Sequence, residues 1–152
     1  MKKEIEVKIL DKRLFDKGNY PKYQTEGSAG IDLRAMIESK LIVKKNSTEL
    51  IKTGIAVNMK DKNMAATILP RSGMGHKNGI VLGNLVGLID SDYQGEIKIS
   101  CWNRSDQDFT IEPGDRIAQM VFVPIIQVKL KEVSSFEETE RGTMGFGYTG
   151  VN

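Results

Sequence analysis

The chain has 152 residues, 39% of them hydrophobic and 28% charged, and its 22 basic and 20 acidic residues leave a formal charge of +2. This length predicts one domain, and this composition excludes a disordered or fibrous chain. Because backbone phosphate binding needs a clustered basic surface, the near balance of charge argues against a nucleic-acid partner. The single cysteine, Cys101, excludes a disulfide framework and a cysteine-rich metal site.

The N-terminus predicts a first strand and not a targeting signal. Polar and apolar residues alternate over residues 4–10, and no continuous apolar segment follows Met1. No stretch reaches the roughly 18 apolar residues of a membrane helix. With the lone cysteine, these features predict a cytoplasmic protein with no membrane partner.

The apolar pattern beyond this point has mostly a period of two, which is typical of strands. Helical stripes are scarce, and we expect only one short helix, from Ser72 through Met74 and His76. Many short strands separated by turns predict an all-β sandwich or barrel. The expected strands are residues 4–10, 29–35, 41–44, 54–59, 65–69, 80–84, 86–90, 96–102, 108–112, 117–124 and 126–130.

The strand at 29–35 places Asp32 and Arg34 on one face. Such a pair is most often an exposed ion pair of little energetic value, about 0–1 kcal/mol. Asp32 is alternatively a residue that orients metal-bound water.

Residues 70–75 follow an apolar strand and contain Arg71, Ser72 and Gly73. Backbone N–H groups at such a turn, together with a hydroxyl and a guanidinium, suit phosphate. The alternative is an ordinary turn in which Ser72 caps the helix. This segment alone favours the turn.

Residues 83–98 contain two apolar runs around the turn from Asp90 to Gly95, which predicts a hairpin. Asp90 stands where the first run ends, and a carboxylate on rigid backbone suits a general base. Aspartates also form turns through local hydrogen bonds, and this is the preferred interpretation for Asp92. For Asp90 the two interpretations are balanced.

The run at 117–123 is apolar throughout except for Gln119. It predicts a strand covered on both faces, as at a subunit interface, in which Gln119 must find a structural or ligand partner. We expect a surface or structural role for His76, and a core strand position for Cys101.

The sequence changes character after residue 133, which divides it into a β domain at 1–133 and a C-terminal arm at 134–152. The arm is polar, then rich in glycine, and it carries Arg141 and Phe146. A solvated terminus is one interpretation. We favour an arm that closes over a flat, anionic ligand, because a cation and an aromatic ring on a glycine-rich segment suit such a lid.

Five segments in this order resemble the five motifs of the trimeric dUTPase family, bacterial type. The resemblance covers nearly the whole chain. The segments are residues 29–35, 70–74, 87–97, 116–120 and 141–147. It implies a jelly-roll-like β-barrel and a homotrimer whose active sites each take residues from three subunits. It also implies hydrolysis of dUTP to dUMP and pyrophosphate, which supplies dUMP for thymidylate synthesis and keeps uracil out of DNA.

The resemblance further implies a role for each matching residue. Asp90 activates the water that attacks the α-phosphorus. Mg²⁺ is held mainly by triphosphate oxygens and waters, with Asp32 acting through water. The residues implied to bind the phosphates are Arg71, Ser72, Gly73 and Gln119. Those implied to bind uracil are Asn84, Leu88, Ile89 and the backbone of Lys98, and Tyr93 is implied to bind the deoxyribose. Arg141 and Phe146 are implied to act in closure of the arm.

Two alternatives have different chemistry. A deoxycytidine triphosphate deaminase shares the fold but needs a catalytic glutamate, whereas this segment offers Asp90 and Tyr93. A trimeric β protein that binds nucleotide without turnover is disfavoured by the presence of Asp90 and a complete arm.

Overall fold

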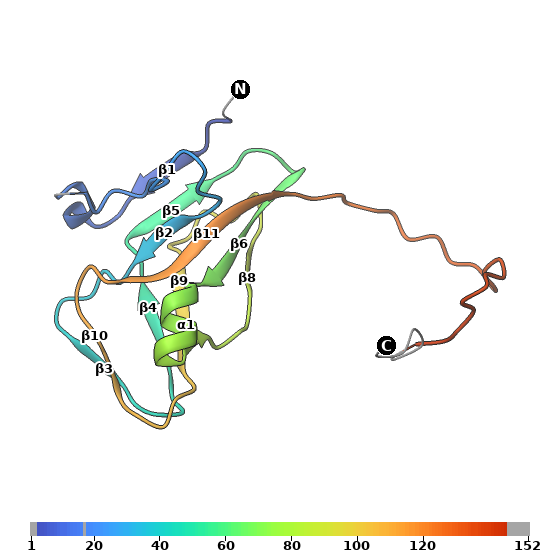
Figure 1. The fold of residues 1–152 in the computed structure, drawn as a ribbon. Coiled ribbons are helices and arrows are strands. Elements are labelled where there is room, and N and C mark those ends of the chain that lie inside the picture. Colours follow the sequence, from blue (N-terminus) through green and yellow to red (C-terminus); the bar gives the residue numbers. More distant parts are fainter. Residues whose placement is uncertain (1–2, 17, 146–152) are drawn as a thin grey trace.

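The computed structural model describes residues 3–16 and 18–145, which form eleven strands, one α-helix and one 3-10 helix (Figure 1). The all-β prediction with one short helix is therefore confirmed. The elements are β1 (Glu6–Ile9), the 3-10 helix (Lys12–Phe15), β2 (Ile31–Arg34), β3 (Leu41–Val43), β4 (Thr48–Lys52), β5 (Ile55–Asn58), β6 (Met64–Pro70), α1 (Ser72–Asn78), β7 (Ile80–Leu82), β8 (Gly87–Ile89), β9 (Lys98–Asn103), β10 (Phe109–Ile111) and β11 (Arg116–Pro124).

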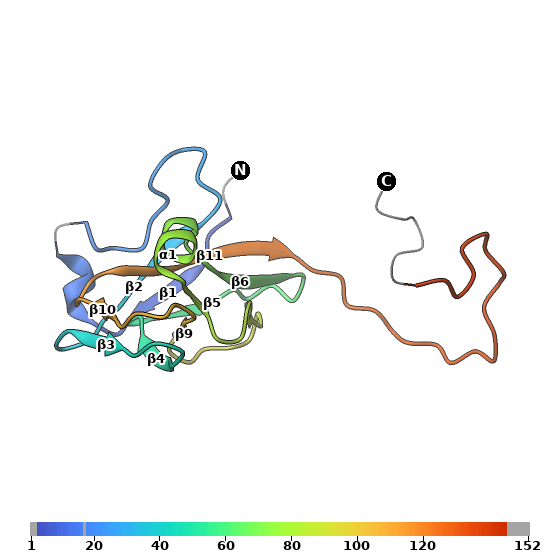
Figure 2. The same ribbon diagram turned by 60° about the horizontal axis from the view of Figure 1, so that its bottom comes forward.

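The strands pair antiparallel in four sheets that enclose one core. The largest sheet has the order β2-β11-β6-β8, and a second has the order β4-β9-β7; β1 pairs with β5, and β10 with β3. Figure 2 shows β2, β11 and β6 in one layer and β3, β4 and β9 in another. The described strands thus surround the core as separate sheets, without one continuous ladder that closes a barrel.

Aliphatic side chains from both layers fill the core, as the period-two pattern predicts. Leu33, Ile99 and Ile117 are each at most 2% exposed. Cys101 lies among them and is 1% exposed, so its expected position in a core strand is confirmed. Burial and the nearby Glu49 raise the pKa of the Cys101 thiol to about 11, which keeps the thiol protonated and unreactive at neutral pH.

One strand was missed because its sequence does not alternate. In β4 the adjacent Leu50 and Ile51 are both apolar, but Leu50 is 66% exposed and Ile51 is buried. The strand forms because β9 supplies a full antiparallel partner, from Thr48 opposite Trp102 to Lys52 opposite Lys98.

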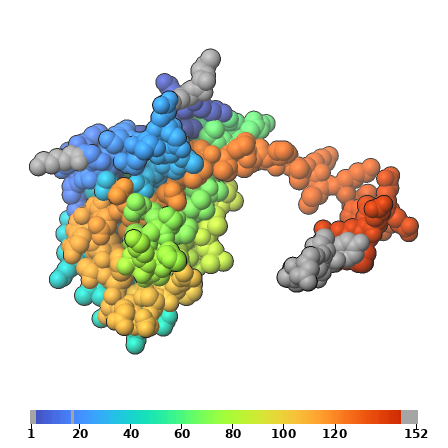
Figure 3. Space-filling view, in the orientation of Figure 1, coloured from blue at the N-terminus to red at the C-terminus, as the bar shows by residue number. Residues whose placement is uncertain are grey.

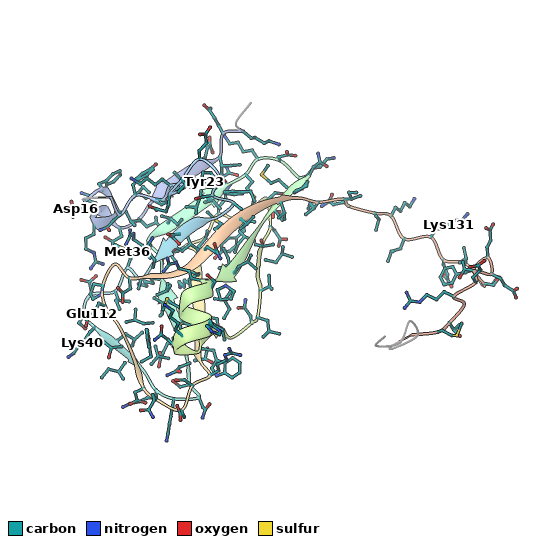
Figure 4. The ribbon with its side chains drawn as sticks, viewed as in Figure 1. Asp16, Tyr23, Met36, Lys40, Glu112 and Lys131 are labelled. Atoms are coloured by element: carbon teal, nitrogen blue, oxygen red, sulfur yellow. The ribbon has the colours of Figure 1, made fainter. Side chains whose placement is uncertain are left out.

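The predicted strand at 126–130 is wrong for this chain. Its side chains alternate, but Ile126 and Leu130 are each 89% exposed, and no described strand pairs with the segment. Residues 126–145 are exposed and extend away from the sheets (Figure 3). Figure 4 shows Lys131 on this segment, clear of the sheets. A strand needs a hydrogen-bonded neighbour, and the described residues of one chain provide none here.

The predicted helix at Ser72 is confirmed as α1, but the predicted serine cap is wrong. The residue at the N-cap is Arg71, and its side chain makes no capping hydrogen bond. The helix ends at Gly79, whose positive φ of 69° suits glycine and whose N–H donates to the carbonyl of Met74. No described helix is long and apolar enough to cross a membrane.

Candidate functional site

The predicted hairpin at 83–98 is wrong, because its two arms join different sheets. Strand β8 pairs with β6, and β9 pairs with β4 and β7. Ile97 explains the divergence: its N–H donates to the carbonyl of Ile55 at 2.9 Å, and its carbonyl accepts from the Thr53 hydroxyl at 2.6 Å. The backbone groups that a hairpin ladder would use are therefore engaged elsewhere.

A pocket of about 390 Å³ lies between the diverging arms, and we call it the loop pocket. It is lined by Leu88, Ile89, Asp90, Tyr93, Glu96, Ile97 and Lys98. A smaller hollow of about 180 Å³ shares Leu88, Ile89 and Lys98 with it and adds Asn84. The structure thus brings together the six residues predicted for base, sugar and catalysis.

Asp90 and Tyr93 lie on the wall of the loop pocket and are both exposed to solvent. The backbone N–H of Tyr93 donates to the carbonyl of Asp90 at 3.2 Å, and the Tyr93 hydroxyl donates to the carbonyl of Glu96 at 3.1 Å. Gly95 allows this arrangement, because a Cβ there would lie 2.5 Å from the Tyr93 hydroxyl oxygen. The ring is therefore held across the turn.

A second group of side chains, the Asp32 cluster, gathers at the start of α1 and β11. Its members are Asp32, Arg71 and Arg116. The Asp32 Oδ1 accepts from Arg71 Nε at 3.0 Å, and Oδ2 accepts from Arg116 Nη1 at 3.1 Å. The predicted pairing of Asp32 with Arg34 is wrong, since Arg34 donates instead to the carbonyl of Gly114 at 2.7 Å. The cluster carries two positive charges and one negative charge on the surface.

Gln119 lies beside this cluster, opposite Asp32 in the β2–β11 ladder. Its amide nitrogen donates to the carbonyl of Pro70 at 3.0 Å, which gives the half-buried side chain a structural partner. Gly30 leaves the space for it, because a Cβ there would lie 2.9 Å from the amide oxygen. Exposed Ser72 and Gly73 follow Arg71 at the start of α1. The four residues predicted for phosphate are thus neighbours.

The loop pocket and the Asp32 cluster lie at opposite ends of β6. Ile89, which precedes Asp90, pairs with Ala66, whereas Arg71 follows the last residue of the strand. Five residues of extended strand from Ala66 to Arg71 correspond to about 17 Å. Within one chain, the backbones of the two groups are therefore separated by most of the length of β6.

The arm is described as far as residue 145. Arg141 is exposed, and its Nε donates to the carbonyl of Met144 at 3.0 Å. Phe146 lies outside the described residues. The predicted closure of the arm thus stays a prediction.

Among the described residues, no three acidic, histidine or cysteine side chains gather where they could hold a metal ion. Asp32 is the one carboxylate in its cluster, and each of its oxygens already accepts from an arginine. A single carboxylate whose oxygens are already engaged suits a contact with a cation through water. The Asp32 cluster therefore fits a cation that is coordinated mainly by water molecules and by the bound ligand.

Arg116 and Glu96 also belong to the site, although their sequence pattern did not predict a role for them. Glu96 lines the loop pocket, and its carboxylate accepts from the N–H of Gly54 at 3.1 Å. Arg116 is the first residue of the fourth motif and lies three positions before Gln119. This position in the motif could have predicted that it belongs to the site.

The fold and these two groups of side chains define a mostly β protein with surface features suited to a small phosphorylated ligand. The family model described as dUTPase matches residues 16–150. The chain belongs to the dUTPase family.

Curated relatives from bacteria match along almost the whole chain. The deoxyuridine 5'-triphosphate nucleotidohydrolase of Idiomarina loihiensis is 60% identical over 147 residues, which cover 97% of this chain and 97% of the relative. That of Shewanella loihica is 59% identical over 151 residues, 99% of each chain. Among solved structures, the dUTPase of Staphylococcus bacteriophage 80alpha with dUPNHPP has a TM-score of 0.85 and 28% identity, over 99% of this chain and all of that chain.

Proposed function

We propose that this chain hydrolyses dUTP to dUMP and pyrophosphate, and that each active site combines the loop pocket of one copy with the Asp32 cluster of another. The observation that carries the reaction is the near full-length similarity to curated dUTP nucleotidohydrolases. The separation along β6 supports the sharing of sites between copies. Three copies, with the arm of the third covering the site, form the homotrimer that the motifs imply.

Asp90 is the general base of this reaction. Its exposed carboxylate takes a proton from a water molecule, whose oxygen attacks the α-phosphorus as the bond to the bridging oxygen breaks and pyrophosphate leaves. General-base assistance of this kind contributes about 10²- to 10⁴-fold to the rate. The remaining acceleration requires stabilisation of phosphate charge and correct positioning.

The Asp32 cluster and its neighbours provide that stabilisation. Arg71, Ser72, Gly73 and Gln119 bind phosphate oxygens. The resemblance of the five motifs implies Mg²⁺, which when bound would neutralise the developing charge on the phosphates. Asp32 would hold this ion through water, in keeping with a carboxylate whose oxygens are already engaged.

The loop pocket selects the base and the sugar. Asn84, the backbone around Leu88 and Ile89, and the backbone of Lys98 bind the uracil edge, since all line the two adjoining hollows. Tyr93 stacks on the deoxyribose and leaves no room for a ribose 2′-hydroxyl. Arg141 and Phe146 of the arm cover the γ-phosphate and the uracil face.

The direct test is release of pyrophosphate from dUTP in the presence of Mg²⁺, by the wild-type chain and by Asp90→Asn. We expect wild-type turnover and a loss of at least about 100-fold in kcat for the variant, with nucleotide binding retained. Turnover by Asp90→Asn near the wild-type rate would show that another group is the base. Release of ammonia from dCTP would instead identify a deaminase.

A further inference from the structure

Strand β11 begins with an irregularity that redirects Arg116. In the β2–β11 ladder Arg116 lies opposite Arg34, a position that an unbroken ladder would give to Ile117. Since side chains alternate along a strand, Arg34 shares a face with Asp32, and an unbroken ladder would turn Arg116 to the buried face of Leu33. The bulge therefore brings this guanidinium to Asp32.

Arg116 then contacts Arg71 in two ways. Its backbone carbonyl accepts from Arg71 Nη1 at 3.3 Å, and its side chain holds the Oδ2 of Asp32, whose Oδ1 accepts from Arg71 Nε. Asp32 is the most buried of the three, with a side chain 15% exposed, against 29% for Arg71 and 41% for Arg116. Two of the three nitrogens of Arg71 thus donate to groups of the chain itself.

The third nitrogen, Nη2 of Arg71, has no hydrogen-bond partner in the described part of the chain. A carboxylate facing an arginine alone tends to form two parallel hydrogen bonds, here to Nε and Nη2. Arg116 opposes this arrangement, because it occupies the second oxygen of Asp32. Without Arg116, the carboxylate would be free to draw Nη2 inward.

We propose that Arg116 is a positioning residue for the triphosphate: it limits Asp32 to one hydrogen bond with Arg71 and so leaves the Nη2 edge of Arg71 for phosphate. This inference rests on the proposed function. Arg116 itself acts through Asp32 and Arg71, and its removal should weaken substrate binding more than the chemical step.

The test compares Arg116→Met, Arg116→Lys and a control, Arg104→Met, in steady-state hydrolysis of dUTP with thermal unfolding alongside. Arg104→Met removes the same charge from an exposed side chain that donates one long hydrogen bond, 3.4 Å to the carbonyl of Gly75. For Arg116→Met we expect KM to rise about 10-fold, the scale of one charge-assisted hydrogen bond, with a much smaller change in kcat. Lysine keeps the charge and one donor for Oδ2, so its KM should fall between those of wild type and Arg116→Met.

A KM for Arg116→Met within about twofold of wild type would overturn the inference, as would a lysine variant with no recovery. If Arg116→Met does not fold, Arg116→Lys decides by the same criterion of a raised KM with nearly constant kcat. Hydrolysis of dUTP by the wild-type chain separates the proposed function from the role of Arg116. If the wild-type chain hydrolyses dUTP, an unchanged KM for Arg116→Met overturns only the role of Arg116. If it does not, both the proposed function and this inference fail.

Discussion

Replacing Gly95 with alanine should displace Tyr93 while leaving the fold intact. The added Cβ would lie 2.5 Å from the hydroxyl oxygen of Tyr93, 2.7 Å from Cζ and 3.1 Å from Cε2. Real Cβ atoms essentially never lie within 3.0 Å of such a neighbour, as two of these contacts require, so one group must move. The clashing atoms are at the outer end of the side chain of a residue that is 43% exposed, and rotation of the ring is therefore the easiest relief.

The cost to stability should be small, because the ring moves into solvent. The move breaks the hydrogen bond from the Tyr93 hydroxyl to the carbonyl of Glu96, which contributes about 0.5–1.5 kcal/mol. The effect on specificity should be larger. If Tyr93 excludes a ribose hydroxyl, its displacement should reduce the preference for dUTP over UTP by about 10-fold or more.

The assay is pyrophosphate release from dUTP and from UTP, reported as the ratio of the two kcat/KM values, with thermal unfolding measured in parallel. Gly27→Ala is a matched control, since a Cβ at that position would meet nothing within 4 Å. A Gly95→Ala variant that keeps the wild-type ratio would refute the role assigned to Tyr93 in sugar selection.

Two further predictions concern titratable groups outside the site. The Asp11 side chain accepts from the backbone N–H of Arg13 at 2.9 Å, and hydrogen bonds from the Arg13 side chain lower the pKa of the Asp11 carboxyl. The ionised Asp11 carboxylate therefore stabilises the folded chain at neutral pH, and this stabilisation is lost as the pH falls through the lowered pKa. Asp11→Asn keeps an oxygen acceptor for the N–H of Arg13 but removes the charge paired with its guanidinium. It should therefore reduce the unfolding free energy by about 0.5 kcal/mol at pH 7 and by less in acid, and an equal loss at both pH values would contradict this account. The buried Cys101 thiol, with its pKa of about 11, should resist Ellman's reagent until the chain unfolds; rapid labelling of the folded protein would show that its strand opens.

Most strands could be predicted because their apolar residues alternate around one core. The pattern at 96–102 placed Cys101 correctly in a core strand, and the apolar stretch from 117 to 123 predicted most of β11. The same rule failed at 126–130, where the pattern is regular but the described residues supply no neighbouring strand. Alternation of polar and apolar residues indicates which face of a strand can be buried. It does not indicate whether a neighbouring strand is present to pair with it.

The site could be predicted in its residues but not in its arrangement. Asp90 and Tyr93 were found because they follow an apolar run in a polar turn. The opening of that turn into a pocket depends on the contact of Ile97 with Thr53, 44 residues away. Likewise, Arg116 reaches Asp32 across 84 residues only because of a bulge, which a period-two pattern does not reveal.

The sharing of active sites between copies is the central claim, and mixed oligomers test it most directly. Asp90→Asn lacks the base, and Arg71→Ala lacks a phosphate-binding guanidinium of the Asp32 cluster. Each variant alone should be nearly inactive. Co-refolding them in equal amounts allows an intact loop pocket of one chain to meet an intact Asp32 cluster of another.

Random assembly predicts that about one quarter of the sites in such a mixture are intact, so that about one quarter of the wild-type activity returns. Refolding each variant separately and mixing afterwards provides the control for simple addition of residual activities. Recovery to about this level is the result we expect. Activity no greater than the sum of the two variants, in mixed oligomers shown to form, would contradict the account and place Asp90 and Arg71 in the site of a single chain.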